Sequence, residues 1–94
     1  MADLLSDLEA LLVSRREEQP EGSYSVTLLT DPTTVQRKIM EEAFEVCLEL
    51  GAPDVDRHRT ASEAADLVFH LMAGLVGAGV AWDDVLAELA NRRR

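Results

Sequence analysis

The chain has 94 residues, of which 18 are acidic and 9 are basic, so its formal net charge is -9 at pH 7. This length suits one domain, and we expect residues 1–94 to form a single one. An acidic protein repels polyanions, which argues against nucleic-acid binding and against binding to anionic membranes. The start of the sequence has no signal-peptide pattern and no apolar stretch is long enough for a membrane span, so we expect a soluble, cytoplasmic protein.

The small size also bears on assembly. A domain of this length buries only about 60% of the surface that its unfolded chain exposes. Burial shared between subunits adds stability that so small a core lacks. We therefore expect an oligomer.

The first third of the chain combines one clear helical pattern with one ambiguous segment. Apolar residues from Leu4 to Leu12 recur at the helical period, and Gln19-Pro20-Glu21-Gly22 ends that pattern. The segment from Gly22 to Thr30 is short and partly β-prone, but no second strand is available to pair with it. We interpret it as a loop or a short helical turn.

Three further helices are predicted downstream. Asp31-Pro32 opens the second helix, because a capping acceptor precedes the residue that suits the first helical position, and Gly51-Ala52-Pro53 stops it. The apolar stripe of this helix includes Cys47, which we expect to be a buried structural thiol.

The third predicted helix starts at Asp54 or as late as Thr60, ends at Gly77, and is apolar almost all round, so we expect it to be the most buried. The last helix runs from Trp82 to about Asn91, with three apolar residues expected to face inward, namely Val85, Leu86 and Leu89. The sequence thus predicts an all-α fold, an antiparallel bundle of about four helices.

Acidic side chains form strips on the second and third helices. On a helical wheel, Glu42 and Glu45 flank the apolar stripe of the second helix, and Glu63 and Asp66 share a narrow strip of the third with Arg59 and His70. Charged groups on a mostly buried helix are costly unless they are paired or bound to a metal. If the two helices pack antiparallel, four carboxylates converge, those of Glu42, Glu45, Glu63 and Asp66.

Such a cluster needs a cation. Two like charges at about 4 Å repel by roughly 4 kcal/mol at an effective dielectric constant near 20. Oxygen ligands on rigid helices select hard cations, Mg²⁺ first and Mn²⁺ as a substitute. Mg²⁺ keeps waters, takes phosphate oxygens as further ligands, and activates water for attack on a phosphoryl group. The carboxylate pattern therefore predicts a magnesium-dependent hydrolase that acts on a phosphoryl group.

Structural explanations exist for the same residues. The glutamates of the second helix suit a solvated face. Glu63 stands three residues after Thr60, the spacing of a capping box. Asp66 has Arg59 and His70 as available partners, and a lone histidine on an apolar helix is more often a hydrogen-bonded core residue than a ligand. The spacing of i, i+3 on two consecutive helices favours the metal site over these alternatives.

The same acids carry a resemblance. Glu41-Glu42-Ala43-Phe44-Glu45 followed by Glu63-Ala64-Ala65-Asp66 resembles the Glu-Glu-x-x-Glu and Glu-x-x-Asp signature of the all-α nucleoside triphosphate pyrophosphohydrolases, the MazG-like proteins. Within that superfamily the chain is similar, along nearly its whole length, to the phosphoribosyl-ATP pyrophosphatases. The segments that carry this likeness are Pro20-Glu21-Gly22-Ser23-Tyr24, Lys38 to Ala43, Glu63 to Leu71, and Asp83-Asp84-Val85.

The resemblance implies an activity and roles for particular residues. The family hydrolyses phosphoribosyl-ATP to phosphoribosyl-AMP and pyrophosphate, the second step of histidine biosynthesis. It implies that Glu41 supports the metal ligands or positions water and that Lys38 contacts phosphate. Ser23 and Tyr24 would help to form the substrate entrance, or else serve as a turn residue and a packed aromatic. The family also implies a homodimer whose four-helix core mixes subunits.

Two other functions are compatible with the sequence. Thr27 stands where the family usually has a lysine, and Met40 stands where a glycine is common, which affects the assignment of phosphate-binding groups. The first alternative is therefore a MazG-like house-cleaning enzyme acting on free nucleoside triphosphates. The second is a non-enzymatic acidic helical module that binds a partner protein.

Overall fold

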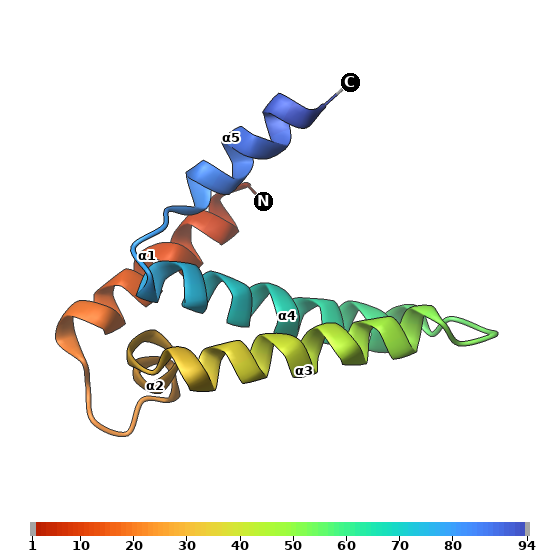
Figure 1. The fold of residues 1–94 in the computed structure, drawn as a ribbon, viewed down its shortest axis with the longest axis horizontal. Coiled ribbons are helices and arrows are strands. Elements are labelled where there is room, and N and C mark those ends of the chain that lie inside the picture. The colour runs from red at the N-terminus through yellow and green to blue at the C-terminus, as the bar shows by residue number, and fades with distance from the viewer. Residues whose placement is uncertain (1, 94) are drawn as a thin grey trace.

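The computed structural model describes residues 2–93, and these form five helices with no strand (Figure 1). The helices are α1 (Ala2–Glu18), α2 (Tyr24–Thr30), α3 (Pro32–Leu50), α4 (Arg57–Gly77) and α5 (Trp82–Arg92). The all-α prediction is confirmed. The ambiguous segment after Gly22 is the short helix α2, in agreement with the helical-turn alternative.

Helices α3 and α4 form a long antiparallel hairpin, and the two helices lie side by side along most of their length (Figure 1). At its start, Asp31 accepts hydrogen bonds from the Thr33 amide (3.2 Å) and the Thr34 hydroxyl (2.8 Å), and these bonds, the Thr34 hydroxyl first, lower the pKa of Asp31. The predicted opening of this helix is confirmed.

The start of α4 lies between the two predicted positions. Asp56 caps it by accepting a hydrogen bond from the Arg59 amide at 3.0 Å. Thr60 lies inside the helix, and its hydroxyl donates to the Asp56 carbonyl at 2.7 Å. The capping-box explanation of Glu63 is therefore wrong, because Thr60 does not occupy the N-cap.

The core lies where α1 and α2 pack against the C-terminal half of α4. Its buried apolar members are Leu12, Leu28, Leu29, Val35, Met72, Ala73 and Val76. Gly77 allows α2 to approach closely, since a Cβ atom there would lie 2.6 Å from the Leu29 carbonyl oxygen. Two hydrogen bonds tie α1 to this end: Arg16 Nη1 donates to the Val76 carbonyl (2.6 Å), and Glu9 Oε2 accepts from the Trp82 amide at the start of α5 (2.7 Å).

Several residues expected to be buried are exposed. Cys47 lies on the outer surface of α3, so the prediction of a buried thiol is wrong for the single chain. Leu86 and Leu89 are exposed on α5, which projects from the bundle (Figure 1). The buried residues of α4 are confined to its C-terminal half. Within the described residues, the outer face of α3 and the side of α5 that carries Leu86 and Leu89 are therefore apolar and exposed.

The length and hydropathy of the helices bear on membrane spanning. Within residues 2–93, no single helix has the length and hydropathy needed to cross a membrane. Taken together, helices α4 and α5 have a length and composition that could cross a membrane, but the pair is bent by 113°.

Candidate metal and nucleotide site

The hairpin brings three of the predicted metal ligands together. One carboxylate oxygen each from Glu42, Glu45 and Glu63 lies within 4.8 Å of the other two. Glu42 and Glu45 stand one turn apart on α3, and Glu63 faces them from α4, because the two helices run antiparallel. Glu42 is buried, Glu63 is half-buried and Glu45 is exposed, so the cluster opens to solvent on the Glu45 side.

The three carboxylates perturb one another. The pKa of Glu63 is raised from 4.5 to about 7, first by a hydrogen bond with the Glu45 side chain, then by burial and by the charges of Glu45, Asp66 and Glu42. Carboxylates this close repel one another when all are ionised, which favours a proton on Glu63. With a pKa of about 7, Glu63 in the metal-free cluster is about half protonated near neutral pH, in a place where a cation would fit.

The donor atoms suit a hard divalent cation. Glu42 Oε2 and Glu63 Oε2 are enclosed and have no hydrogen-bond partner among the described residues. Buried carboxylate oxygens without partners are costly, and a metal ion would satisfy both. All the donors are oxygens, which is typical of magnesium, manganese and calcium sites.

Asp66 takes a different place from the other three acids. It is exposed, and its carboxylate is not one of the three whose oxygens lie within 4.8 Å of one another. Its charge nevertheless contributes to the raised pKa of Glu63. Arg59, one of its two suggested partners, pairs with Glu49 instead at 3.1 Å. The Asp66 carboxylate is thus next to the cluster, one turn along α4 from Glu63.

Lys38 lies between two acids. Its Nζ atom is 3.5 Å from Glu41 Oε2 and 3.7 Å from Glu42 Oε1. The pKa of Lys38 is raised, chiefly by the charge of Glu41. Glu41 also lies near Arg37, with 3.9 Å between Arg37 Nε and Glu41 Oε1, and so contacts basic groups beside the cluster rather than belonging to it. A Lys38 ammonium beside Glu42 is well placed to meet a phosphate carried by a metal.

His70 joins the start of α2 to the cluster. Its ring is buried, with Nδ1 2.7 Å from the Asp66 carbonyl oxygen and Nε2 2.9 Å from the Tyr24 hydroxyl. Nδ1 also lies 4.0 Å from Glu42 Oε1. The expectation of a hydrogen-bonded core histidine is confirmed. The Tyr24 contact was missed, because no local pattern links residues 46 positions apart.

The N-cap and the first residue of α2 are the two predicted entrance residues. Tyr24 is the first residue of α2 and is 51% exposed. Ser23 occupies the N-cap position, but its side chain makes no capping hydrogen bond. Tyr24 is near enough to Lys38 to contribute to its raised pKa, which places the start of α2 beside the cluster.

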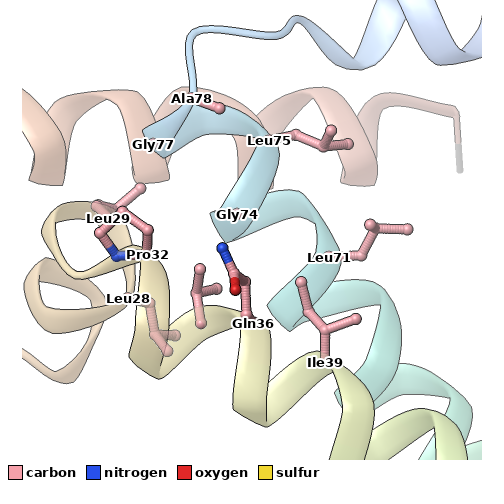
Figure 2. A pocket seen from close by; sticks show the side chains of 11 residues that line it. Leu28, Leu29, Pro32, Gln36, Ile39, Leu71, Gly74, Leu75, Gly77 and Ala78 are labelled. Carbon is pink, nitrogen blue, oxygen red and sulfur yellow. The ribbon is translucent and has the colours of Figure 1, made fainter.

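A separate apolar hollow lies between α2, α3 and the C-terminal half of α4 (Figure 2). Its volume is about 240 Å³, and it is lined by Leu28, Leu29, Pro32, Val35, Gln36, Ile39, Leu71, Gly74, Leu75, Gly77 and Ala78. No titratable side chain is among them. The hollow can accommodate apolar groups but offers no acid, base or metal ligand.

Comparison with known proteins bears on what this site does. The family model described as phosphoribosyl-ATP pyrophosphohydrolase matches residues 5–93. The chain belongs to the phosphoribosyl-ATP pyrophosphohydrolase family. It is 41% identical over 93 residues to the phosphoribosyl-ATP pyrophosphatase of Pelotomaculum thermopropionicum, covering 98% of this chain and 93% of that protein. It is 38% identical to the enzyme of that name from Metallosphaera sedula over the whole of both chains.

Other relatives in this family are larger. The histidine biosynthesis bifunctional protein of Pasteurella multocida is 40% identical over 89 residues, which are 94% of this chain and 43% of that protein. No solved structure gave a significant match. Membership of the phosphoribosyl-ATP pyrophosphohydrolase family confirms the resemblance seen in the sequence and favours histidine biosynthesis over nucleotide-pool cleaning.

Proposed function

We propose that this chain hydrolyses phosphoribosyl-ATP to phosphoribosyl-AMP and pyrophosphate, the second step of histidine biosynthesis. Water attacks the α-phosphorus, the bond from that phosphorus to the bridging oxygen breaks, and the β and γ phosphates leave as pyrophosphate. The family match supports the reaction. The observation that carries the chemistry is the group of three carboxylates across the α3–α4 hairpin.

We propose that Glu42, Glu45, Glu63 and Asp66 hold Mg²⁺, with Mn²⁺ as a substitute. When bound, Mg²⁺ supplies Lewis-acid polarisation of phosphoryl oxygens and activation of water. This assignment is supported for Glu42 and Glu63 by one enclosed carboxylate oxygen on each, which has no hydrogen-bond partner among residues 2–93. Asp66 joins on the exposed side by a change of side-chain rotamer, which its exposure allows.

The residues around the cluster bind and orient the substrate. Lys38 contacts the phosphates, and Glu41 holds the ammonium in place through its 3.5 Å contact. Among the catalytic residues, Glu42 and Glu45 orient the reacting phosphate and water, and Glu41 supports them. Ser23 and Tyr24 form the entrance, since both lie at the start of α2 beside Lys38.

The direct test is pyrophosphate release in the presence of Mg²⁺. Phosphoribosyl-ATP is compared with ATP, dATP, dCTP and dUTP at matched concentrations. A strong preference for phosphoribosyl-ATP is expected. A preference for a free triphosphate would instead support nucleotide-pool cleaning, and no release from any substrate by folded protein would refute an enzymatic role.

We also propose that the protein is a homodimer that covers the outer face of α3. Met40 (73% exposed), Phe44 and Leu48 stand at successive turns of this face. Gln36 lines both the apolar hollow and the surface around Met40 and Phe44, so the two regions are adjacent. An exposed apolar area of this kind marks an interaction surface, and a second copy would bury it as a four-helix core.

The dimer has its own test. The molar mass in solution is measured by light scattering for the unsubstituted protein, Phe44→Glu and Leu4→Glu. Leu4 is a matched control, because it is an exposed leucine on α1, away from the proposed interface. We expect twice the chain mass for the unsubstituted protein and for Leu4→Glu, and the mass of one chain for Phe44→Glu. A monomeric unsubstituted protein would refute the dimer.

The remaining expectations follow from the same activity. We propose that residues 1–94 act as one domain, that the substrate is a small nucleotide with no requirement for nucleic acid or membrane, and that the protein works in the cytoplasm. The full-length match to the Metallosphaera sedula protein supports the single domain. Fractionation of cells that express the chain with a small tag would test the location.

A further inference from the structure

In a neutral His70 ring, the direction of both of its hydrogen bonds follows from the geometry. A carbonyl oxygen can only accept, so the 2.7 Å contact with the Asp66 carbonyl requires a proton on Nδ1. In a neutral ring with its proton on Nδ1, Nε2 carries the lone pair. The 2.9 Å contact with Tyr24 must then be a hydrogen bond that the Tyr24 hydroxyl donates to Nε2.

The ring that accepts this hydrogen bond is held firmly. Tyr24 and Phe69 both meet it edge-on, with centroid distances of 5.9 Å and 5.2 Å and interplanar angles of 78° and 87°. The imidazole is also buried. Rotation of the ring about its own axis would break two hydrogen bonds, so the position of Nε2 is fixed relative to α4.

The fixed acceptor on His70 determines whether the Tyr24 hydroxyl can donate or accept a further hydrogen bond on its solvent-exposed side. With a neutral His70 ring, the single proton of the Tyr24 hydroxyl lies in the hydrogen bond to Nε2. The phenol oxygen keeps its lone pairs, and the side chain is half-exposed beside Lys38. Ionised phosphate oxygens only accept hydrogen bonds, so Tyr24 in this arrangement cannot donate to a phosphate.

We propose that His70 is a positioning residue for substrate recognition. It orients the Tyr24 hydroxyl so that the phenol oxygen accepts a hydrogen bond from a donor on the nucleotide, a ribose hydroxyl or an amino group. This inference rests on the proposed function, because it assigns a contact to the substrate of that reaction. In this arrangement Lys38 and the metal ligands bind the phosphates, and Tyr24 binds the sugar or the base.

Three substitutions separate the two hydrogen bonds of His70. Tyr24→Phe removes the hydroxyl and keeps the ring. His70→Asn keeps a donor near the position of Nδ1 and loses the contact with Tyr24. His70→Gln reaches the position of Nε2 with an amide oxygen that accepts from Tyr24. Far-ultraviolet circular dichroism checks folding, and if His70→Asn fails to fold, Tyr24→Phe and His70→Gln carry the test.

The expected kinetic result is a change in KM rather than in kcat. One lost substrate hydrogen bond weakens binding about tenfold, so Tyr24→Phe and His70→Asn should each raise KM for phosphoribosyl-ATP about tenfold and change kcat less than about threefold. His70→Gln should stay within about threefold of the unsubstituted KM. The double variant Tyr24→Phe with His70→Asn should be no worse than either alone, because both remove the same contact. Equal and additive losses in kcat would overturn the proposal.

Deoxy analogues identify the donor. If the effect of Tyr24→Phe disappears with a substrate that lacks one ribose hydroxyl, that hydroxyl is the donor. If it persists with each deoxyribose analogue, the amino group is the donor. If Tyr24→Phe has no effect on KM for the normal substrate, the proposal is wrong. No turnover by the unsubstituted protein would instead refute the proposed reaction, so the two failures are distinguishable.

Nuclear magnetic resonance tests the hydrogen-bond direction without substrate. The chain has two histidines, so long-range ¹H–¹⁵N spectra of the unsubstituted protein and of His58→Gln assign the His70 ring. We expect a protonated Nδ1 and an unprotonated Nε2, with the Nε2 signal shifted in Tyr24→Phe. A proton on Nε2 in the assay buffer would reverse the hydrogen bond and overturn the proposal.

Discussion

Binding of Mg²⁺ to the metal-free chain should release a proton, and the amount should depend steeply on pH. The proton is the one that the raised pKa of Glu63 keeps on this carboxyl group, beside Glu45. Metal ligands must be deprotonated, so a cation in the cluster displaces it. With the pKa of Glu63 at about 7, binding should release about 0.9 proton per chain at about pH 6 and about 0.1 at about pH 8.

Isothermal titration calorimetry measures this release, since the observed heat depends on the ionisation enthalpy of the buffer in proportion to the protons transferred. Two buffers at each pH are sufficient. Glu63→Gln is the control, because the amide has no proton to lose, and any binding that survives should be independent of the buffer. Mg²⁺ binding by the unsubstituted protein with the same proton release at both pH values would refute the proton on Glu63.

The same raised pKa has a consequence for stability, and its sign follows from linkage. The folded chain binds a proton at Glu63 with a pKa of about 7, whereas the unfolded chain binds it at about 4.5, so between these values the folded state holds more protons. The contribution of Glu63 to stability is therefore fully present below about pH 4.5 and is lost as the pH rises through about 7. Glu63→Gln should remove this slope from the melting temperature of the metal-free protein.

Three other substitutions have defined outcomes. Glu45→Gln should abolish pyrophosphate release while the melting temperature stays equal or rises, because it removes a ligand and relieves carboxylate repulsion; retained activity would remove Glu45 from the site. Lys38→Ala should raise KM with little change in kcat, and an unchanged KM would exclude a phosphate contact. Gly77→Ala places a Cβ atom 2.6 Å from the Leu29 carbonyl oxygen, so overpacking should cost roughly 1–3 kcal/mol and lower the melting temperature by roughly 4–20 °C. A melting temperature within about 2 °C of the parent would show that α2 moves aside easily.

Local signals in the sequence predicted most of the helices. The Asp31-Pro32 opening and the apolar periods were sufficient for α3, α4 and α5 to within a few residues. Segment α2 stayed ambiguous because seven residues hold barely two helical turns, and what stabilises it is the burial of Leu28 and Leu29 against distant helices. Tertiary packing, which no local pattern shows, decides such a segment.

The carboxylate site was predictable for a similar reason, and the exposed faces were not. Spacing of i, i+3 fixes which side chains share a helix face, and one antiparallel hairpin then brings Glu42, Glu45 and Glu63 together. An apolar stripe, in contrast, shows that a face is to be buried without showing against what. Cys47 and Leu89 have the pattern of core residues, yet both are exposed in the single chain. Burial of such residues depends on another molecule.

The charge distribution supports the proposal that this acidic chain uses a cation when it binds a nucleotide. With a net charge of -9, the chain repels a polyphosphate, and the Lys38 ammonium is engaged by the carboxylates of Glu41 and Glu42. A divalent cation at the cluster would neutralise Glu42 and so weaken one of these two contacts. The ammonium could then turn toward a phosphate while Glu41 keeps hold of it. Metal binding and phosphate binding would thus be coupled through Glu42, which both the cation and Lys38 contact.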